Sequence, residues 1–165
     1  MKTLHVLRHA KSSWQSPGLS DHDRDLNDRG RRDAPNMGRA LSESVSPMVI
    51  HCSSAVRAQR TLEGLCSAWP GLDAQQHLVE DALYTFSWEE LMDWLQNLHS
   101  QSESCFLISH NPGLTDLCNQ LTGRQAIDNL PTAGYLRFCL PVEHWSDVTP
   151  GIAELQHYFF PRSLA

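Results

Sequence analysis

The sequence has no long hydrophobic run, no paired cysteines and no low-complexity segment. No apolar run in the 165 residues approaches the length of roughly 18 residues that a membrane span needs. Charges also interrupt the short apolar stretch at the start. The five cysteines are widely spread, without a CxxC pair, which argues against a disulfide framework and a cysteine-built zinc site. We therefore expect a single domain over residues 1–165 that is cytoplasmic and has no membrane partner.

Basic charge is also scarce. The chain carries 13 Lys and Arg against 19 Asp and Glu, a formal net charge of −6, and it has no basic run or tail. A general nucleic-acid surface is therefore not expected. The cations that matter must be concentrated locally, in a pocket that suits a compact anion better than a polyanion.

Short apolar runs alternate with segments of helical periodicity along the chain. We expect strands over about 3–7, 48–52, 78–79, 105–108, 132–140 and 152–160, and helices over about 29–45, 53–69, 87–98 and 114–121. Asn27 or Asp28 can cap the first helix, Ser53 or Ser54 the second, and Ser87 begins a capping box at the third. This alternation predicts an α/β fold with a mostly parallel sheet.

The stretch Leu4–Trp14 changes abruptly from apolar to cationic. The apolar run ends at Leu7, and Arg8, His9 and Lys11 follow where the first strand is expected to end. Ligands of open α/β sheets bind at the carboxyl ends of strands. A histidine between two cations is poorly placed to ligate a metal and well placed to meet an anion. We therefore expect neither a metal nor a cofactor at this site.

Two further strand ends carry polar residues of the same kind. Ser54 and Arg57 follow the second strand, and Ser109 and His110 follow the strand at 105–108. Because the carboxyl ends of parallel strands share one edge, these residues are expected to converge with His9. Helix N-termini and arginine forks both favour phosphate. Such a set can transfer a phosphoryl group through a neutral histidine whose other ring nitrogen holds the proton, while the arginines stabilise the phosphoryl oxygens.

Four segments resemble motifs of the histidine phosphatase superfamily, which has the phosphoglycerate mutase-like fold. In chain order they are LRHAKS at 7–12, DRDL at 23–26, CSSAVRAQRT at 52–61 and ISHNPG at 108–113. Ala10 replaces a glycine of the family pattern, and Asp25 and Ser54 each replace a proline. The order and spacing of the four motifs, together with the small size of the chain, favour the branch of SixA-type phosphohistidine phosphatases. The resemblance implies a three-layer αβα sandwich.

The resemblance also implies roles for individual residues. His9 would be the nucleophile that becomes phosphorylated, and Arg8, Arg57 and His110 would bind the phosphoryl group. Further candidates for phosphate contact are Arg24, Lys11 and Ser12. For Arg24 the alternative is a surface ion pair with the neighbouring aspartates, and His51, just before the second strand end, is expected to face the core.

A proton donor is marked less clearly. Larger members of the family use a glutamate to protonate an alkoxide leaving group. Glu80 and Asp81 lie in the region expected for it, and the alternative is a solvated acidic turn. A phosphohistidine substrate releases an imidazole, which leaves more readily than an alkoxide, so a strong acid matters less for that substrate.

The function implied is that of a metal-independent protein phosphohistidine phosphatase that acts through a phosphohistidine intermediate. Its expected partner is a phosphohistidine-bearing phosphotransfer protein of a signal transduction pathway, and the expected oligomeric state is a monomer. The alternative is a phosphomonoesterase acting on small phosphorylated metabolites. A third hypothesis, a non-catalytic phosphate-binding module, does not account for a nucleophile.

Overall fold

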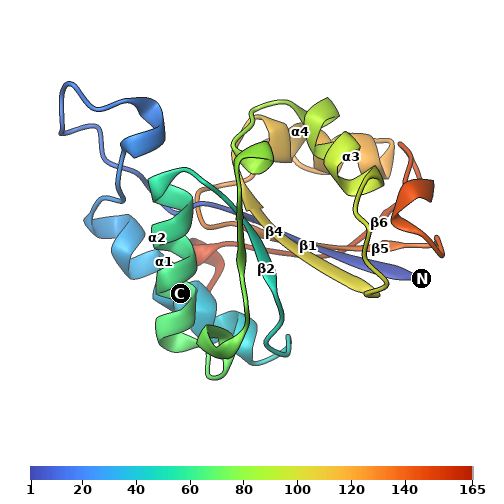
Figure 1. Cartoon of the computed structure of the whole chain (residues 1–165), viewed down its shortest axis with the longest axis horizontal. Helices are drawn as coiled ribbons and strands as arrows, with labels where there is room; N and C mark the ends of the chain where they lie inside the picture. The colour runs from blue at the N-terminus through green and yellow to red at the C-terminus, as the bar shows by residue number, and fades with distance from the viewer. Residues whose placement is uncertain (165) are drawn as a thin grey trace.

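The computed structural model describes residues 1–164, which form a six-stranded sheet in the order β3-β2-β4-β1-β5-β6 (Figure 1). The strands are β1 (Lys2–Arg8), β2 (Ile50–Ser53), β3 (Leu78–Glu80), β4 (Ser104–Ser109), β5 (Tyr135–Leu140) and β6 (Glu154–Phe159). The pairs β2/β3, β2/β4 and β1/β4 are parallel, whereas β1/β5 and β5/β6 are antiparallel. The prediction of a mostly parallel sheet is confirmed.

Helices cover both faces of this sheet and give the expected three layers (Figure 1). The helices α1 (Asp28–Ser42) and α2 (Val56–Ala68) cover one face, and α3 (Trp88–Gln96) and α4 (Gly113–Thr122) cover the other. Within residues 1–164 there are also five short 3-10 helices: η1 (Asp21–Asp23), η2 (Leu72–Ala74), η3 (Asp81–Leu83), η4 (Trp145–Asp147) and η5 (Pro161–Leu164). None of the described helices is long and apolar enough to cross a membrane.

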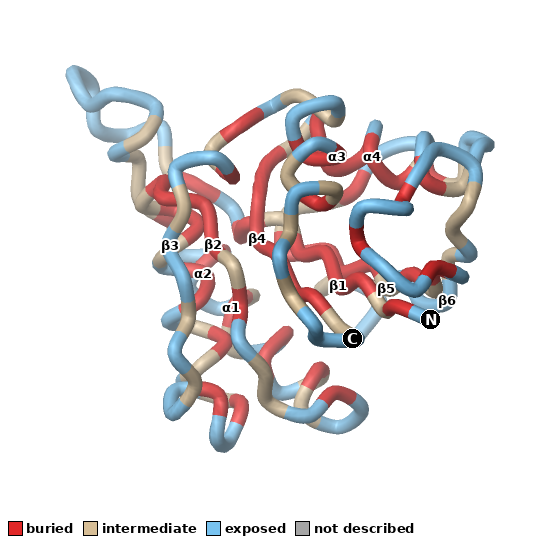
Figure 2. The backbone as a smooth tube through the Cα atoms, turned by 45° about the vertical axis from the view of Figure 1, so that its right-hand side comes forward, coloured by how far each residue is buried: buried red, intermediate tan, exposed pale blue. Residues whose placement is uncertain are grey.

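The central strands are apolar because each of them faces two cores. Along β4, Cys105 and Leu107 pack into the core under α3 and α4, while Phe106 and Ile108 pack into the core under α1 and α2. Figure 2 shows β1 and β4 buried along most of their length, whereas the edge strand β3 is largely exposed. The buried strands therefore form a rigid frame whose carboxyl ends carry polar residues.

Small residues let α1 and α2 approach closely. A Cβ at Gly38 would lie 2.6 Å from the backbone oxygen of Leu65, and one at Gly64 would lie 2.5 Å from the Cβ of Ala34. Both distances are far below a normal carbon contact, so side chains at these positions would force the helices apart. The close packing of α1 on α2 fixes where the first turn of α2 meets the end of β1.

Two of the helix starts differ from expectation. Asn27 caps α1 by accepting a hydrogen bond from the Gly30 N–H at 2.9 Å, as its sequence position predicts. The prediction for α2 was wrong, because the N-cap is Ala55 and no side chain caps this helix. At α3, Ser87 accepts from the Glu90 N–H, but the Glu90 carboxylate binds Thr85 instead of closing the capping box.

Candidate active site

Three parallel strand ends meet at one edge of the sheet. His9 follows β1 and His110 follows β4, and the two imidazole rings lie with their centroids 5.0 Å apart. The backbone N–H of His9 donates to the carbonyl oxygen of Ser109 at 3.3 Å, which ties the two segments together. Arg57 reaches the same point from the first turn of α2, which follows β2. The structure thus brings together the histidines and the arginine that the sequence placed far apart.

His9 is buried, with 6% of its surface exposed, and both ring nitrogens have defined neighbours. Its Nδ1 lies 2.7 Å from the carbonyl oxygen of Ala10, so Nδ1 carries a proton and donates it there. The Arg57 Nε–H donates to Nε2 at 3.4 Å, which leaves Nε2 as an unprotonated nitrogen. Burial, with the charges of Arg57 and Arg8, lowers the pKa of His9 to about 3, although the Ala10 hydrogen bond acts in the opposite direction.

A hydroxyl on α2 holds the loop that carries His9. The Ala10 N–H donates to Thr61 Oγ1 at 2.9 Å, and Thr61 Oγ1 donates in turn to the carbonyl oxygen of Arg57 at 2.8 Å. Thr61 is fully buried, so this link is shielded from water. His9 and Arg57 are therefore fixed relative to one another through a single side chain between them.

His110 and Arg8 present unpaired polar atoms next to His9. Ser53 Oγ accepts from the Ala55 N–H and lies 2.7 Å from His110 Nε2; with the Ser53 hydroxyl donating to Nε2, the single N–H of the neutral His110 ring is at Nδ1. Arg8 Nη1 donates to the Leu130 carbonyl oxygen at 2.9 Å. His110 Nδ1 and Arg8 Nε are buried, and neither has a partner among residues 1–164. Buried donors are normally paired, so these two are suited to the oxygens of an anion at His9.

The serines expected to cap α2 serve this site instead. Ser53 binds His110, as described above, and Ser54 Oγ lies 3.0 Å from Nε2 of His22 in η1. α2 begins at Val56, so its N-cap is Ala55, which has no side-chain acceptor. Ser53 and Ser54 lie before the N-cap, and Ser53 Oγ reaches the N–H of Ala55 itself, so the first turn of α2 stays uncapped.

The further phosphate candidates are placed unequally. Arg24 Nη1 donates to Ser12 Oγ at 2.8 Å, and its guanidinium stacks on the Trp14 ring at 3.6 Å. Arg24 also forms an ion pair with Asp21 at 3.1 Å, which was the alternative to its predicted contact with phosphate, and the phosphate contact stays a prediction. The Lys11 side chain is exposed, and no hydrogen bond of it is found within residues 1–164.

The backbone of Lys11 requires a glycine at position 30, four residues after the DRDL segment. The Lys11 carbonyl oxygen accepts from the Asn27 N–H at 3.0 Å, and a Cβ at Gly30 would lie 2.2 Å from that oxygen. Only glycine allows α1 to start against this loop. The contact holds the segment from Asp23 to Leu26 beside the end of β1.

Neither acid proposed from the sequence, Glu80 or Asp81, is bonded to His9 or His110. The Glu80 carboxylate binds His51 Nδ1 at 2.6 Å through Oε2 and accepts from Trp94 Nε1 at 3.1 Å through Oε1. Asp81 is exposed at the start of η3. His51, expected to face the core, is only partly buried, because it pairs with Glu80 at the edge of the sheet.

A carboxylate that sequence reasoning considered only as a partner of Arg24 lies at the centre of the contacts. Asp21, in η1, accepts hydrogen bonds from Arg57, from Arg24 and from the Tyr84 hydroxyl, the last at 2.6 Å. Partial burial alone would raise the pKa of Asp21, but the bonds from Tyr84, Arg57 and Arg24 outweigh it and lower the pKa to about 2. The sequence signal that could have indicated these contacts is the spacing of Asp21, which lies three residues before Arg24.

An unprotonated nitrogen on His9, surrounded by Arg8, Arg57 and His110, defines a site able to bind and accept a phosphoryl group. A protein-family model for the histidine phosphatase superfamily (branch 1) matches residues 4–93. An uncharacterized protein of Mycobacterium tuberculosis is 30% identical over 166 residues, which cover 94% of this chain and 100% of that protein. The chain belongs to the histidine phosphatase superfamily, and this membership supports phosphatase activity.

Solved structures show the same fold. The protein histidine phosphatase SixA complexed with tungstate superposes with a TM-score of 0.79 at 20% identity, covering 99% of both chains. A mycobacterial glucosyl-3-phosphoglycerate phosphatase superposes with a TM-score of 0.72 at 13% identity, covering 94% of this chain and 97% of that chain. The expected phosphoglycerate mutase-like fold is confirmed, and proteins that share it act on different phosphorylated substrates.

Proposed function

We propose that this chain is a protein phosphohistidine phosphatase in which Nε2 of His9 is the nucleophile. The observation that carries the proposal is the state of the His9 ring. Its proton is held at Nδ1 by the Ala10 carbonyl oxygen, while Nε2 is unprotonated and faces the Arg57 guanidinium. A histidine that must attack phosphorus needs this tautomer at neutral pH.

In the proposed reaction the phosphoryl group passes from a substrate histidine to His9. A bond forms between phosphorus and Nε2 of His9 as the phosphorus–nitrogen bond of the substrate breaks, and the departing imidazole nitrogen takes up a proton from solvent. Arg8, Arg57 and His110 hold the phosphoryl oxygens and stabilise the charge on them in the transition state. Water then attacks the phosphorylated His9 and releases inorganic phosphate, which restores the neutral ring.

No acid placed to protonate a leaving group at His9 is found within residues 1–164, and this favours a phosphohistidine substrate over a phosphate ester. Both oxygens of Glu80 are engaged by His51 and Trp94, and Asp21 is ionised with a pKa of about 2. An alkoxide leaving group needs a proton donor, whereas an imidazole leaving group needs much less help. The similarity of the fold to SixA, which is a protein histidine phosphatase, supports the same substrate class. The partner proposed is accordingly a phosphotransfer protein.

A direct comparison of substrates tests this proposal. The protein is incubated with a phosphohistidine-bearing phosphotransfer protein and, separately, with phosphoserine and a sugar phosphate, and the released phosphate is followed. We expect kcat/KM for the phosphohistidine protein to exceed that for both esters. A higher kcat/KM for an ester would make the chain a metabolite phosphomonoesterase, the alternative raised from the sequence. Binding of phosphate without any turnover would indicate a phosphate-binding module.

A further inference from the structure

We propose that Asp21 is a positioning residue for phosphoryl transfer, because it holds Arg57 in the orientation that the reaction at His9 requires. The inference rests on the proposed attack by His9. It assigns a role to a side chain of the loop between β1 and α1 that lies outside the family motifs described above. Asp21 itself does not contact His9.

The Arg57 guanidinium makes three hydrogen bonds within residues 1–164. Its Nη1 donates to the main-chain oxygen of Asp21 at 2.6 Å, and its Nη2 donates to Asp21 Oδ2 at 3.0 Å. Its Nε donates to His9 Nε2 at 3.4 Å. A guanidinium is a rigid planar fork, so gripping its outer end fixes the direction of the Nε side. Asp21 grips the outer end and thereby aims the Nε side at the nitrogen proposed to attack.

Asp21 is in turn held from two sides. The Tyr84 hydroxyl donates to Oδ2 at 2.6 Å, and Arg24 donates to Oδ1 through Nη2 at 3.1 Å and Nε at 3.3 Å. The Tyr84 ring also meets the His110 ring edge-on, with centroids 5.4 Å apart. The carboxylate therefore joins the rim of the site to both histidines through Arg57 and Tyr84.

The charge of Asp21 has a second effect on the site. It is a resident anion shared by Arg57 and Arg24, close to where the phosphoryl oxygens would lie. Like charges repel, so the carboxylate weakens the binding of any other anion there. Removing its charge has two opposite consequences. The side-chain hold on Arg57 Nη2 weakens while the main-chain contact to Nη1 remains, so Arg57 is less firmly oriented and the transfer slows. The local potential also becomes more positive, which favours a bound anion.

Asp21→Asn tests this pair of consequences, because the side chain keeps its shape and loses its charge. We expect kcat for the His9-dependent reaction to fall about 10- to 100-fold, while tungstate, used as the anionic inhibitor, binds as tightly as in the wild type or more tightly. Tyr84→Phe removes one of the bonds to Asp21 and is expected to change kcat in the same direction by a smaller factor. Tungstate affinity is measured by inhibition and by calorimetry.

Asp23→Asn is the matched control. Asp23 lies in the same 3-10 helix, and within residues 1–164 its carboxylate has one side-chain partner, His22 at 3.4 Å, so kcat should stay at the wild-type value. Wild-type kcat in Asp21→Asn would overturn the inference, as would a parallel loss of kcat, tungstate affinity and melting temperature, which marks a merely structural role. If the wild type itself shows no His9-dependent turnover, the proposed function is wrong and this inference falls with it.

Discussion

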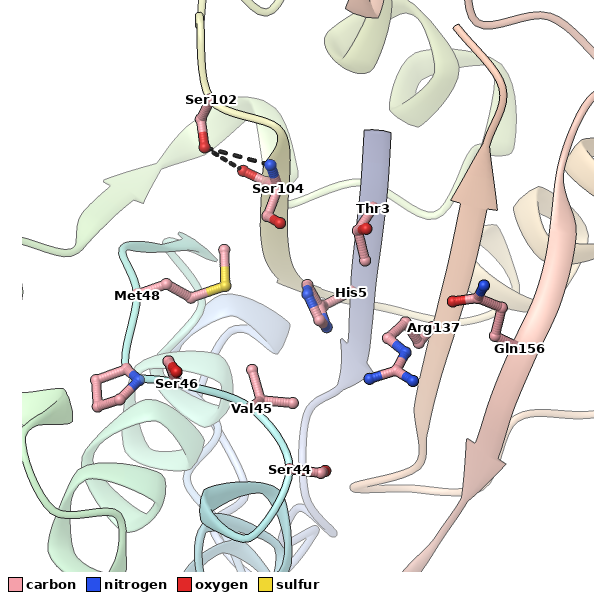
Figure 3. Close-up of a pocket in the computed structure, with 11 residues that line it drawn as sticks. Thr3, His5, Ser44, Val45, Ser46, Met48, Ser102, Ser104, Arg137 and Gln156 are labelled. Atoms are coloured by element: carbon pink, nitrogen blue, oxygen red, sulfur yellow. Dashed lines mark hydrogen bonds between the residues drawn. The ribbon is translucent and has the colours of Figure 1, made fainter. Parts of the chain in front are cut away.

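Two buried histidines differ in their place along β1, and each has an arginine beside it. His9 follows the carboxyl end of the strand and lies beside Arg57, and its Nε2 is unprotonated. His5 lies in the middle of the strand beside Arg137, but its Nδ1 is bonded to the Tyr135 hydroxyl at 2.6 Å and its ring stacks on Phe106 at 5.4 Å. His5 and Arg137 line a pocket of about 400 Å³ that is also bordered by serine side chains (Figure 3).

The difference between the surroundings of His5 and His9 shows what marks a site in this molecule. Burial and the nearby arginine lower the pKa of His5 to about 4, much as burial and cations lower that of His9 to about 3. A perturbed histidine is therefore not by itself the mark of a nucleophile. His9 is distinguished because His110 and Arg8 converge on it. His110 Nδ1 and Arg8 Nε are buried and have no hydrogen-bond partner among residues 1–164.

The largest difference in kcat is expected when each histidine is replaced in turn. His9→Ala should lower kcat at least about 1,000-fold, because no other group replaces a covalent nucleophile. His5→Ala should retain kcat within about 3-fold, since its loss affects packing and not the reacting atoms. Phosphate release from a phosphohistidine protein measures both, with circular dichroism as the check on folding. Equal losses in the two variants would contradict the distinction drawn here.

Arg57 and Arg137, the arginines beside His9 and His5, should differ in the same way. Arg57→Gln should lower kcat about 100- to 1,000-fold, because it removes a charged donor aimed at the reacting group. Arg137→Gln, a matched change beside His5, should leave kcat near the wild-type value. Steady-state kinetics on the same substrate separates the two variants. Retention of full activity in Arg57→Gln would remove Arg57 from the proposed site.

Stability should depend on pH through the buried histidines His5, His9 and His110. In the folded protein the pKa of each is lowered from 6.5, mainly by burial. Arg137 lowers the pKa of His5 further, the site arginines lower that of His9, and His9 and Arg57 lower that of His110. Above pH 6.5 folded and unfolded chains are both neutral at these rings, whereas below it the unfolded chain binds protons that the folded chain excludes. The free energy of unfolding should therefore fall from pH 6.5 towards pH 4, by up to about 1.4 kcal/mol per pH unit for each histidine.

Thermal unfolding at pH 7.5 and at pH 5 measures this effect. The melting temperature should be lower at pH 5, and His5→Gln should make the decrease smaller, because one of the three buried rings no longer titrates. A melting temperature that is unchanged between the two pH values would contradict the assignment of these rings as neutral.

The smallest effect is expected at Glu80. Its carboxylate, like the ring of His5, makes contacts that hold the fold, to His51 and Trp94. Glu80→Gln should therefore change kcat for the phosphohistidine protein by less than about 2-fold, as expected for a group outside the reacting atoms. A large loss confined to phosphate esters would restore Glu80 as a proton donor and favour the metabolite phosphatase. Parallel assays on both substrate classes decide this point.

Sequence patterns predicted the mostly parallel sheet and the meeting of His9, Arg57 and His110, because these three residues follow strands whose apolar runs are local and continuous. The three layers were implied by the resemblance to the family. They did not predict the role of Ser53, since a capping rule considers only the next few residues whereas its partner, His110, is 57 residues away.

The same limit explains why Asp21 was not singled out. Its carboxylate binds Arg57, which is 36 residues away, and Tyr84, which is 63 residues away. Within its own segment it resembles an ordinary solvated aspartate next to an arginine. Glu80 shows the reverse error, because its position along the chain suggested an acid of the site while the fold directs it to His51. Long-range side-chain contacts decide both cases.

Mapping the phosphoenzyme tests the central claim most directly. The protein is mixed with a phosphohistidine-bearing substrate, quenched under alkaline conditions that preserve phosphohistidine, and digested for mass spectrometry. We expect a phosphoryl group on His9, formed and lost at rates that match turnover, and no adduct in His9→Ala. Turnover with the phosphoryl group on His110 or on no histidine of the protein would contradict the account.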